Sequence, residues 1–265
     1  MRLQVLVSTM HQTDHSLLER MNIQSDAVVV NQCDENCIEE FIYEGHKIKW
    51  YSLCDRGVGL SRNTALMHAD ADVVLFADDD VVYEDGYADS VLDFFEKYPS
   101  AKVATFNLQS LNSKRPEYLD TKTHKLSVWN CLRYGAFRIA VRRDAVVSAN
   151  IFFSLLFGGG APFQAGEDNL FLTQCLQKGL CMYAVKIQIG TVKQEESTWF
   201  SGYNEKYYHD RGVLFAAMYG KYSKLMICLI ELKNCRREGT VPFNQRLQNE
   251  FTGIRKFKKT IKGKE

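Results

Sequence analysis

Short apolar runs alternate with helix-like segments from residue 3 to residue 108, and this alternation limits the folds open to the chain. We expect helices at 14–21, 59–69 and 85–98, and strands at 3–9, 26–32, 46–52, 72–77 and 102–108. Alternation of this kind predicts an α/β fold, in which a mainly parallel sheet is flanked by helices on both faces. Ligands of such sheets bind beyond the carboxyl ends of the strands.

The second half of the chain is less regular. Residues 126–146 are rich in β-forming types, the loop and helix of 157–179 lead to a last strand at 180–190, and 210–233 has the pattern of one or two helices. We therefore expect one α/β domain over residues 1–205, followed by a helical extension with a basic tail over 206–265.

Composition excludes several classes of protein. The net charge of +1 gives no general attraction to nucleic acid. The sequence contains no uninterrupted run of about 18 apolar residues, so we expect no membrane span. The start MRLQVLVSTM has the pattern of a strand and not of an export signal, so we expect a cytoplasmic protein with free thiols. Cys33 and Cys37 have no second ligand pair downstream, which argues against a zinc site.

Three aspartates, Asp78, Asp79 and Asp80, follow the apolar strand in DVVLFADDDVV, residues 72–82. Neighbouring carboxylates repel one another and lose hydration when buried. Asp78 and Asp80 can point to the same side of the strand end and hold Mg²⁺ or Mn²⁺ together with phosphate oxygens. The alternative is an ordinary polar loop.

A second acidic pair, Glu167 and Asp168, begins a helix in AGEDNLF. Carboxylates at a helix start are stabilised by the helix dipole, so plain capping is one explanation. The Gly158–Gly160 run just upstream favours another, in which a mobile loop covers a general base. A third segment, DRGVGLSRNTAL, places two glycines and the cations Arg56 and Arg62 at a helix start suited to anions.

The order of these pieces resembles the family 2 glycosyltransferases of the GT-A fold. In that family a glycine-containing loop with an S/A-R-N helix start precedes a strand ending in D-x-D, and a G/E-D helix start follows some ninety residues later. Here the matching stretches are GLSRNTALMHADADVVLFADDDV and AGEDNLFLTQCLQKG. The resemblance covers about residues 3–190 and gives 1–205 the role of a nucleotide-sugar-binding and catalytic domain.

The resemblance implies a role for each matching residue. Asp78 and Asp80 would bind Mg²⁺ or Mn²⁺ on the diphosphate of a nucleotide sugar, and Asp168 would be the catalytic base. Glu167 would line the acceptor pocket. Donor contacts would come from Thr9, Asn31, Arg62 and Asp79. The second strand ends in Asn31 and Gln32 where the family usually has paired acids, which affects the recognition of the base.

The implied reaction is a metal-dependent, inverting transfer of a hexosyl group from a nucleoside-diphosphate sugar to a hydroxyl of a glycan or a lipid-linked acceptor, in surface polysaccharide assembly. One alternative is a phosphatase of the haloacid-dehalogenase type with Asp78 as nucleophile. Another is a nucleotide-sugar binding module without activity.

Three further features have two readings each. Trp129 and Trp199 could stack on an acceptor sugar, although core packing is the commoner use of tryptophan. His209 is a candidate further ligand of the metal or diphosphate, or a surface side chain. The tail GIRKFKKTIKGKE has Ile254, Phe257 and Ile261 at helical spacing among cations, which fits either a peripheral helix on the inner membrane face or a solvated tail.

Overall fold

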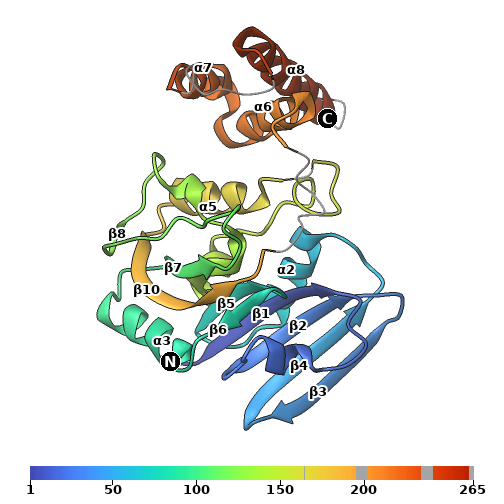
Figure 1. Ribbon diagram of the computed structural model, residues 1–265, viewed down its shortest axis with the longest axis vertical. Helices are drawn as coiled ribbons and strands as arrows, with labels where there is room; N and C mark the ends of the chain where they lie inside the picture. Colours follow the sequence, from blue (N-terminus) through green and yellow to red (C-terminus); the bar gives the residue numbers. More distant parts are fainter. Residues whose placement is uncertain (164, 195–201, 234–240, 263–265) are drawn as a thin grey trace. The chain divides into compact units, whose positions relative to one another are not determined.

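The computed structural model describes residues 1–163, 165–194, 202–233 and 241–262 (Figure 1). The chain forms two compact units. The first consists of Met1–Ala161 and Glu167–Glu196, and the second of Pro162–Gly166 and Ser197–Glu265.

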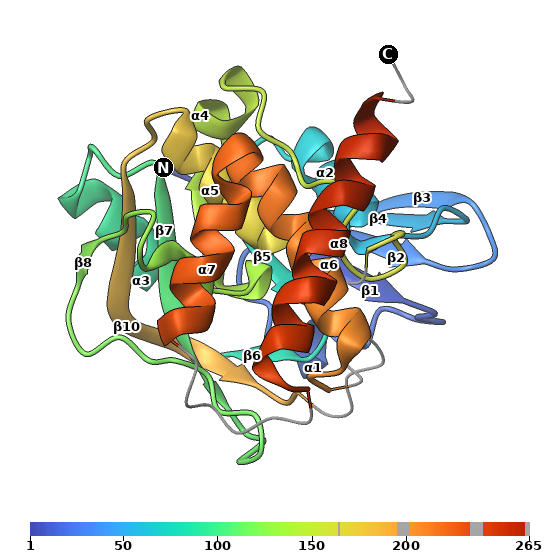
Figure 2. The same cartoon turned by 90° about the horizontal axis from the view of Figure 1, so that it is seen from above.

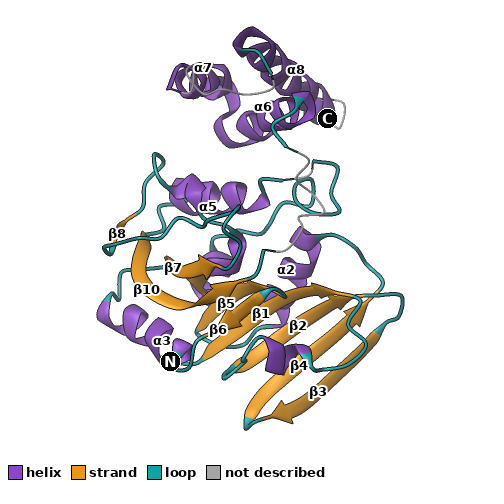
Figure 3. Ribbon diagram, in the orientation of Figure 1, coloured by secondary structure: helices purple, strands orange, loops and turns teal. Residues whose placement is uncertain are grey.

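The first unit is built on a 10-stranded sheet with the order β3-β4-β2-β1-β5-β9-β7-β10-β6, and β8 pairs with β10 (Figure 3). Its strands are β1 (Leu3–Met10), β2 (Asp26–Gln32), β3 (Cys37–Tyr43), β4 (His46–Leu53), β5 (Val73–Asp78), β6 (Val81–Tyr83), β7 (Val103–Ser110), β8 (His124–Lys125), β9 (Ile139–Arg142) and β10 (Met182–Val192). The pairs β4-β2, β2-β1, β1-β5 and β7-β10 are parallel. The remaining pairs are antiparallel, so the sheet is mixed.

Helices cover both faces of this sheet. Alternate side chains of a strand point to opposite faces, and β1 accordingly sends Val5 and Val7 into one apolar cluster and Leu6 into another. The first cluster includes residues of α1 (Leu17–Arg20) and α3 (Tyr87–Lys97). The second includes residues of α2 (Val58–His68), α4 (Arg143–Ser148) and α5 (Glu167–Gln177). The predicted α/β fold with a sheet flanked by helices is confirmed.

Several elements differ from the sequence prediction. Strand β3 was not predicted, because it lies at the sheet edge with its residues exposed or half-buried and has no apolar alternation. Residues 126–146 were expected to be rich in strand, but their one strand is β9, accompanied by the 3-10 turns η1 (Cys131–Arg133) and η2 (Ala136–Arg138). The described cysteines are free thiols, as expected: Cys33, Cys37, Cys54, Cys131, Cys175, Cys181 and Cys228.

The second unit contains the helices α6 (Glu205–Tyr219), α7 (Ser223–Lys233) and α8 (Phe243–Lys262), with the 3-10 turn η3 (Gly220–Tyr222) between α6 and α7 (Figure 2). Helix α8 packs closely on α6. Two glycines permit this approach, because a Cβ at Gly212 would collide with the carbonyl oxygen of Glu250 and one at Gly253 with that of His209.

Buried ion pairs join the three helices. Arg211 of α6 pairs with Glu231 of α7 and with Glu250 of α8, and Arg246 of α8 lies 3.3 Å from Glu231. Both glutamates are 0% exposed. Burial raises the pKa of Glu250 to about 7, although Arg211 opposes this shift.

Residues 253–262 of the basic tail belong to α8, and two of their apolar side chains are buried. Ile254 is 1% exposed and Phe257 is 9% exposed. The expectation that this face inserts into a membrane is therefore wrong for these two residues. Within the described residues, one segment, Glu205–Leu232, is long and apolar enough to cross a membrane by length and composition alone. Core helices of soluble proteins pass the same test.

Phe76 of β5 tests how the sheet holds α5. This fully buried ring packs edge-on against Phe153 at 5.0 Å and Phe171 of α5 at 5.7 Å. We expect Phe76→Ala to lower the free energy of unfolding by about 3–5 kcal/mol, because it leaves a cavity between these rings. Ile38→Ala, at a side chain 63% exposed on β3, should change it by less than about 0.5 kcal/mol. Urea denaturation followed by circular dichroism measures both, and similar losses for the two variants would contradict this account of the core.

Candidate active site

The carboxyl ends of β2, β1 and β5 meet at one edge of the sheet. Thr9 of β1 is in register with Asn31 of β2, and Ser8 is in register with Asp78 of β5. Asp79 and Asp80 form the turn between β5 and β6. The structure thus brings together the strand-end residues that the sequence singled out.

Arg62 connects this edge to the start of α5. Its side chain is 4% exposed and donates hydrogen bonds to Asp78 Oδ1 at 2.6 Å and to Glu167 Oε1 at 2.9 Å. Burial opposes its charge, but the two carboxylates outweigh that effect and raise the pKa of Arg62. The predicted D-x-D and G-E-D motifs are therefore joined through one buried cation.

Asp79 and Asp80 are held in different ways. Asp79 Oδ2 accepts a hydrogen bond from Thr9 Oγ1 at 2.6 Å, and Asp80 Oδ2 accepts one from the Gln194 backbone N–H at 3.1 Å. Burial, followed by the negative charge of Asp78, raises the pKa of Asp80 to about 6. Among the described residues, no cation forms an ion pair with Asp80, so no positive charge there offsets the cost of ionising it.

The donor set suits a cation that arrives with phosphate. No group of three or more His, Cys, Asp or Glu side chains that could hold a metal occurs in the described parts of the chain. Mg²⁺ is commonly held by one or two carboxylates, with water and substrate phosphates as the other ligands. Asp80 can supply such a ligand, and Asp78 can supply one through the oxygen that Arg62 leaves free.

Asp168 has the electrostatic character of a general base. Burial, followed by the charge of Glu167, raises its pKa to about 7. The Asn169 backbone N–H donates to Asp168 Oδ1 at 2.6 Å, which partly opposes the shift. A pKa near the working pH combines an available ionised form with a useful affinity for a proton.

The S-R-N sequence at the start of α2 anchors the site in three directions. Ser61 Oγ accepts a hydrogen bond from Ser8 Oγ of β1 at 2.8 Å, and Arg62 spans the two acidic motifs. Asn63 bonds both backbone groups of Phe153, donating to its O at 2.9 Å and accepting from its N–H at 2.8 Å. The sequence pointed to Arg62 but gave no partners for Ser61 and Asn63.

Close packing accounts for the first of the three glycines before α5. Gly158 has a φ of 100°, and a Cβ there would lie 2.7 Å from Val58 Cγ1 and 2.8 Å from the Glu167 carboxyl group. The Gly159 carbonyl accepts a hydrogen bond from the Val58 N–H at 2.9 Å. The loop therefore seats Glu167 against α2, and its predicted movement stays a prediction.

Gln12 is a site residue that the sequence analysis missed. Its Nε2 donates to Thr9 Oγ1 at 2.9 Å, and its backbone exchanges hydrogen bonds with the Asn31 amide at 3.0 and 2.9 Å. Asn31 is 1% exposed and holds the loop after β1, so its contact with a nucleoside stays a prediction. No motif marked Gln12, because it lies in a loop.

The other predicted residues that the structure describes have contacts outside this hydrogen-bond network. Trp129 is 75% exposed, so the core packing considered for it is wrong, while its contact with an acceptor stays a prediction. His209 belongs to α6 in the second unit, and its ring lies 2.9 Å from Asp210. Arg56 bonds the carbonyls of Cys33 and Cys54 rather than an open anion site. Trp199 lies outside the described residues.

Comparisons with known proteins agree with this description. The family model of glycosyl transferase family 2 matches residues 8–148. The crystal structure of S. aureus TarS 1-349 in complex with UDP-GlcNAc has a TM-score of 0.63 at 12% identity, and the match covers 98% of this chain and 92% of that one. The crystal structure of the same TarS segment in complex with UDP has a TM-score of 0.64 at 12% identity, and the match covers 100% of this chain and 92% of that one.

A further crystal structure of S. aureus TarS gives a TM-score of 0.61 at 14% identity, covering 91% of this chain and 44% of that chain. At these identities the likeness shows a shared fold. No curated protein sequence matches the chain.

Removing the Arg62 cation should destabilise the fold, because the negative charges of Asp78 and Glu167 would no longer be neutralised. We expect Arg62→Met to lower the free energy of unfolding by about 3–5 kcal/mol at pH 7, because Asp78 and Glu167 lose their partner. Lys47→Met breaks an exposed pair with Glu40 and should have a much smaller effect, because water screens that pair. Urea denaturation at pH 7 measures both variants, and similar losses for the two would contradict the electrostatic explanation.

Proposed function

The chain belongs to glycosyl transferase family 2 and is a glycosyltransferase with the GT-A fold, and we propose that it moves a hexosyl group from a nucleoside-diphosphate sugar to a hydroxyl group with inversion at the anomeric carbon. The observation that carries the proposal is the Arg62 bridge, which joins the aspartates at the end of β5 to the acidic start of α5. A site for the leaving diphosphate and a candidate base thereby share one edge of the sheet.

Family membership removes two of the alternatives considered from the sequence. A phosphatase of the haloacid-dehalogenase type is wrong, and so is a binding module without activity, since the chain is a glycosyltransferase. Asp78, the nucleophile of the phosphatase alternative, has one oxygen held by Arg62 at 2.6 Å.

The donor is proposed to be a nucleotide sugar. Structures of TarS with the same fold contain UDP-GlcNAc and UDP, which supports a donor of this chemical class. Asp79 and Thr9, which are hydrogen bonded to each other, and Asn31 are proposed to lie along the nucleoside. Arg62 is proposed to support the donor site indirectly, by holding Asp78 and Glu167 in place, because both terminal nitrogens of its guanidinium group already contact these carboxylates.

Asp80 and Asp78 are proposed to hold Mg²⁺ or Mn²⁺. When bound, the cation would offset the negative charge that develops on the leaving diphosphate. His209 remains a proposed further ligand, without a contact in the described structure that supports it.

Asp168 is proposed to accept the proton of the acceptor hydroxyl. Glu167 raises the basicity of Asp168 by its negative charge, and Arg62 fixes Glu167 in place. Glu167 and the exposed Trp129 are proposed to contact the acceptor, a glycan or a lipid-linked sugar of surface polysaccharide assembly. Inversion follows if the base and the leaving group occupy opposite faces of the transferred sugar. We also propose a cytoplasmic protein at the inner face of the membrane.

Asp168→Asn tests the base. We expect the rate of sugar transfer to fall about 10²–10⁴-fold, while donor binding persists. In the parent protein the rate should rise with pH through about 7, as Asp168 ionises. Because folding raises this pKa, stability is lost as the pH rises through about 7 and Asp168 ionises, so the same variant should unfold less easily at pH 8.

The matched control for that experiment is Asp144→Asn, at a carboxylate 93% exposed on α4. It should leave both the transfer rate and the stability unchanged. An Asp168→Asn protein that keeps more than a tenth of the activity would contradict the assignment of the base.

Asp80→Asn tests the cation site through binding. A thermal-shift screen of nucleoside diphosphates should give a rise in Tm of about 3–6 °C at tenfold excess over Kd, only with Mn²⁺ or Mg²⁺ present. The shift should weaken below about pH 6, where Asp80 takes up a proton. It should vanish in Asp80→Asn and persist in Asp93→Asn, an exposed aspartate of α3. A shift that does not depend on the metal would contradict the proposed cation site but would still support a nucleotide-binding site.

A further inference from the structure

Helices α7 and α8 expose positive charge and bury their negative charge. Their described acids, Glu231 and Glu250, are 0% exposed and paired with Arg211 and Arg246. Every charged side chain that is described as exposed on η3, α7 and α8 is a cation: Lys221, Lys224, Arg255, Lys256, Lys258 and Lys259. The described surface of these helices is therefore cationic.

A stripe of apolar side chains lies along the exposed side of α7. Leu225, Leu229 and Leu232 are 58%, 48% and 62% exposed. Spacings of four and three residues place them on one face of the helix. Ile227 and Glu231 point into the unit instead, at 1% and 0% exposure. We call Leu225, Leu229 and Leu232 the leucine stripe.

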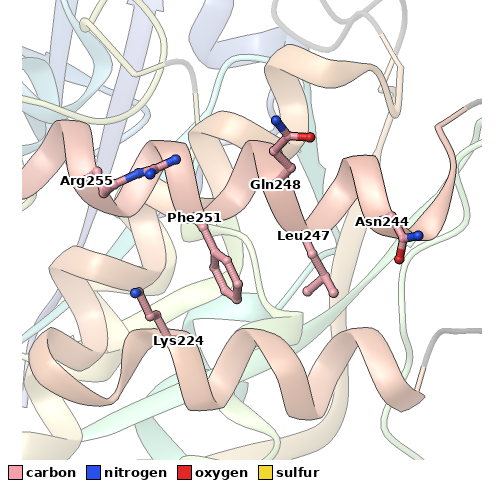
Figure 4. Close-up of a pocket in the computed structure, with 6 residues that line it drawn as sticks. All are labelled: Lys224, Asn244, Leu247, Gln248, Phe251 and Arg255. Carbon is pink, nitrogen blue, oxygen red and sulfur yellow. The ribbon is translucent and has the colours of Figure 1, made fainter.

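A groove between α7 and α8 is lined by Lys224, the sequence neighbour of Leu225, and by side chains of α8 (Figure 4). Leu247 and Phe251 project from α8 toward α7, and Lys224 projects from α7 toward the Phe251 ring, 5.6 Å from its centre. Arg255 lines the same groove and donates to Thr252 at 3.1 Å. Neither Lys224 nor Arg255 has an acidic partner among the described residues. The groove thus combines an apolar floor with two cations available to an anion.

We propose that this face of the second unit docks on an anionic lipid bilayer, with the leucine stripe in the acyl boundary and the groove cations on lipid phosphates. Apolar side chains flanked by lysine and arginine bind such surfaces through buried area and electrostatic attraction together. A second copy of this chain is a poor occupant, because it would bring two cationic faces together. The proposal deepens the membrane contact proposed above and rests on it, but it places the apolar contact on α7 instead of the tail.

Vesicle flotation of the full chain tests the docking. We expect binding to vesicles of phosphatidylcholine with 30% phosphatidylglycerol, little binding to phosphatidylcholine alone, and release by 0.5 M NaCl, since salt screens the cations. Lys224→Gln with Arg255→Gln should weaken binding on the order of 30-fold, at roughly fivefold for each cation removed. Leu225→Gln, Leu229→Gln and Leu232→Gln together should weaken it at least about tenfold.

Matched controls change the same residue types elsewhere. Lys97→Gln with Lys178→Gln removes two exposed cations of α3 and α5 regions, and Ile38→Gln with Ile42→Gln removes two exposed apolar side chains of β3. Both should bind vesicles like the parent protein, and circular dichroism melting should confirm that every variant is folded.

Several results would overturn the proposal. These are absence of parent binding to anionic vesicles, equal loss in the variants and their controls, and binding that resists salt and alkaline carbonate, which would indicate a spanning segment. A dimer in light scattering that the leucine variants abolish would assign the stripe to self-association. Nucleotide thermal shifts of the vesicle variants keep the two proposals apart, because the variants should retain donor binding if only docking is lost.

Discussion

The site depends on the neutralisation of crowded carboxylates by one buried cation. Asp78–Asp80 and the pair Glu167 and Asp168 bring five acids to one unit of the fold. All but Asp79 are half-buried, which strengthens the repulsion between them. Arg62 neutralises two of them and thereby ties β5 to α5. Thr9 supports a third through a neutral hydrogen bond. Asp80 and Asp168 retain raised pKa values, so the repulsion that the fold leaves uncompensated acts on the two residues proposed to meet ligands.

The sequence predicted the parts of this arrangement that follow from strand geometry. Parallel strands end at one edge, so apolar runs ending in Thr9, Asn31 and Asp78 were enough to expect those residues side by side, and the register confirms it. The order of the motifs also predicted the family. The partners of Arg62 could not be predicted from the sequence, because its contact with Glu167 joins residues far apart in the chain and depends on how α5 packs.

The errors have a common physical cause. An apolar stripe in the sequence indicates which face of a helix is apolar, but it does not show what that face packs against. Ile254 and Phe257 have helical spacing and are buried, whereas Leu225 and Leu229 also have helical spacing and are exposed. Trp129 is a large apolar residue that the fold leaves exposed. Patterns along one element therefore predict secondary structure better than they predict the identity of a surface.

The two raised pKa values connect donor binding to catalysis. Asp78 contributes to both, because its negative charge disfavours the ionised forms of Asp80 and of Asp168. A cation that binds Asp78 and Asp80 together with the donor would neutralise them, remove part of that repulsion and lower the pKa of Asp168. The base would then be ionised over a wider pH range with the donor in place than without it. Since Arg62 fixes the relative positions of Asp78 and Glu167, this electrostatic connection needs no movement of the backbone. It makes occupancy of the donor end of the site a condition for full ionisation of Asp168 at the other end.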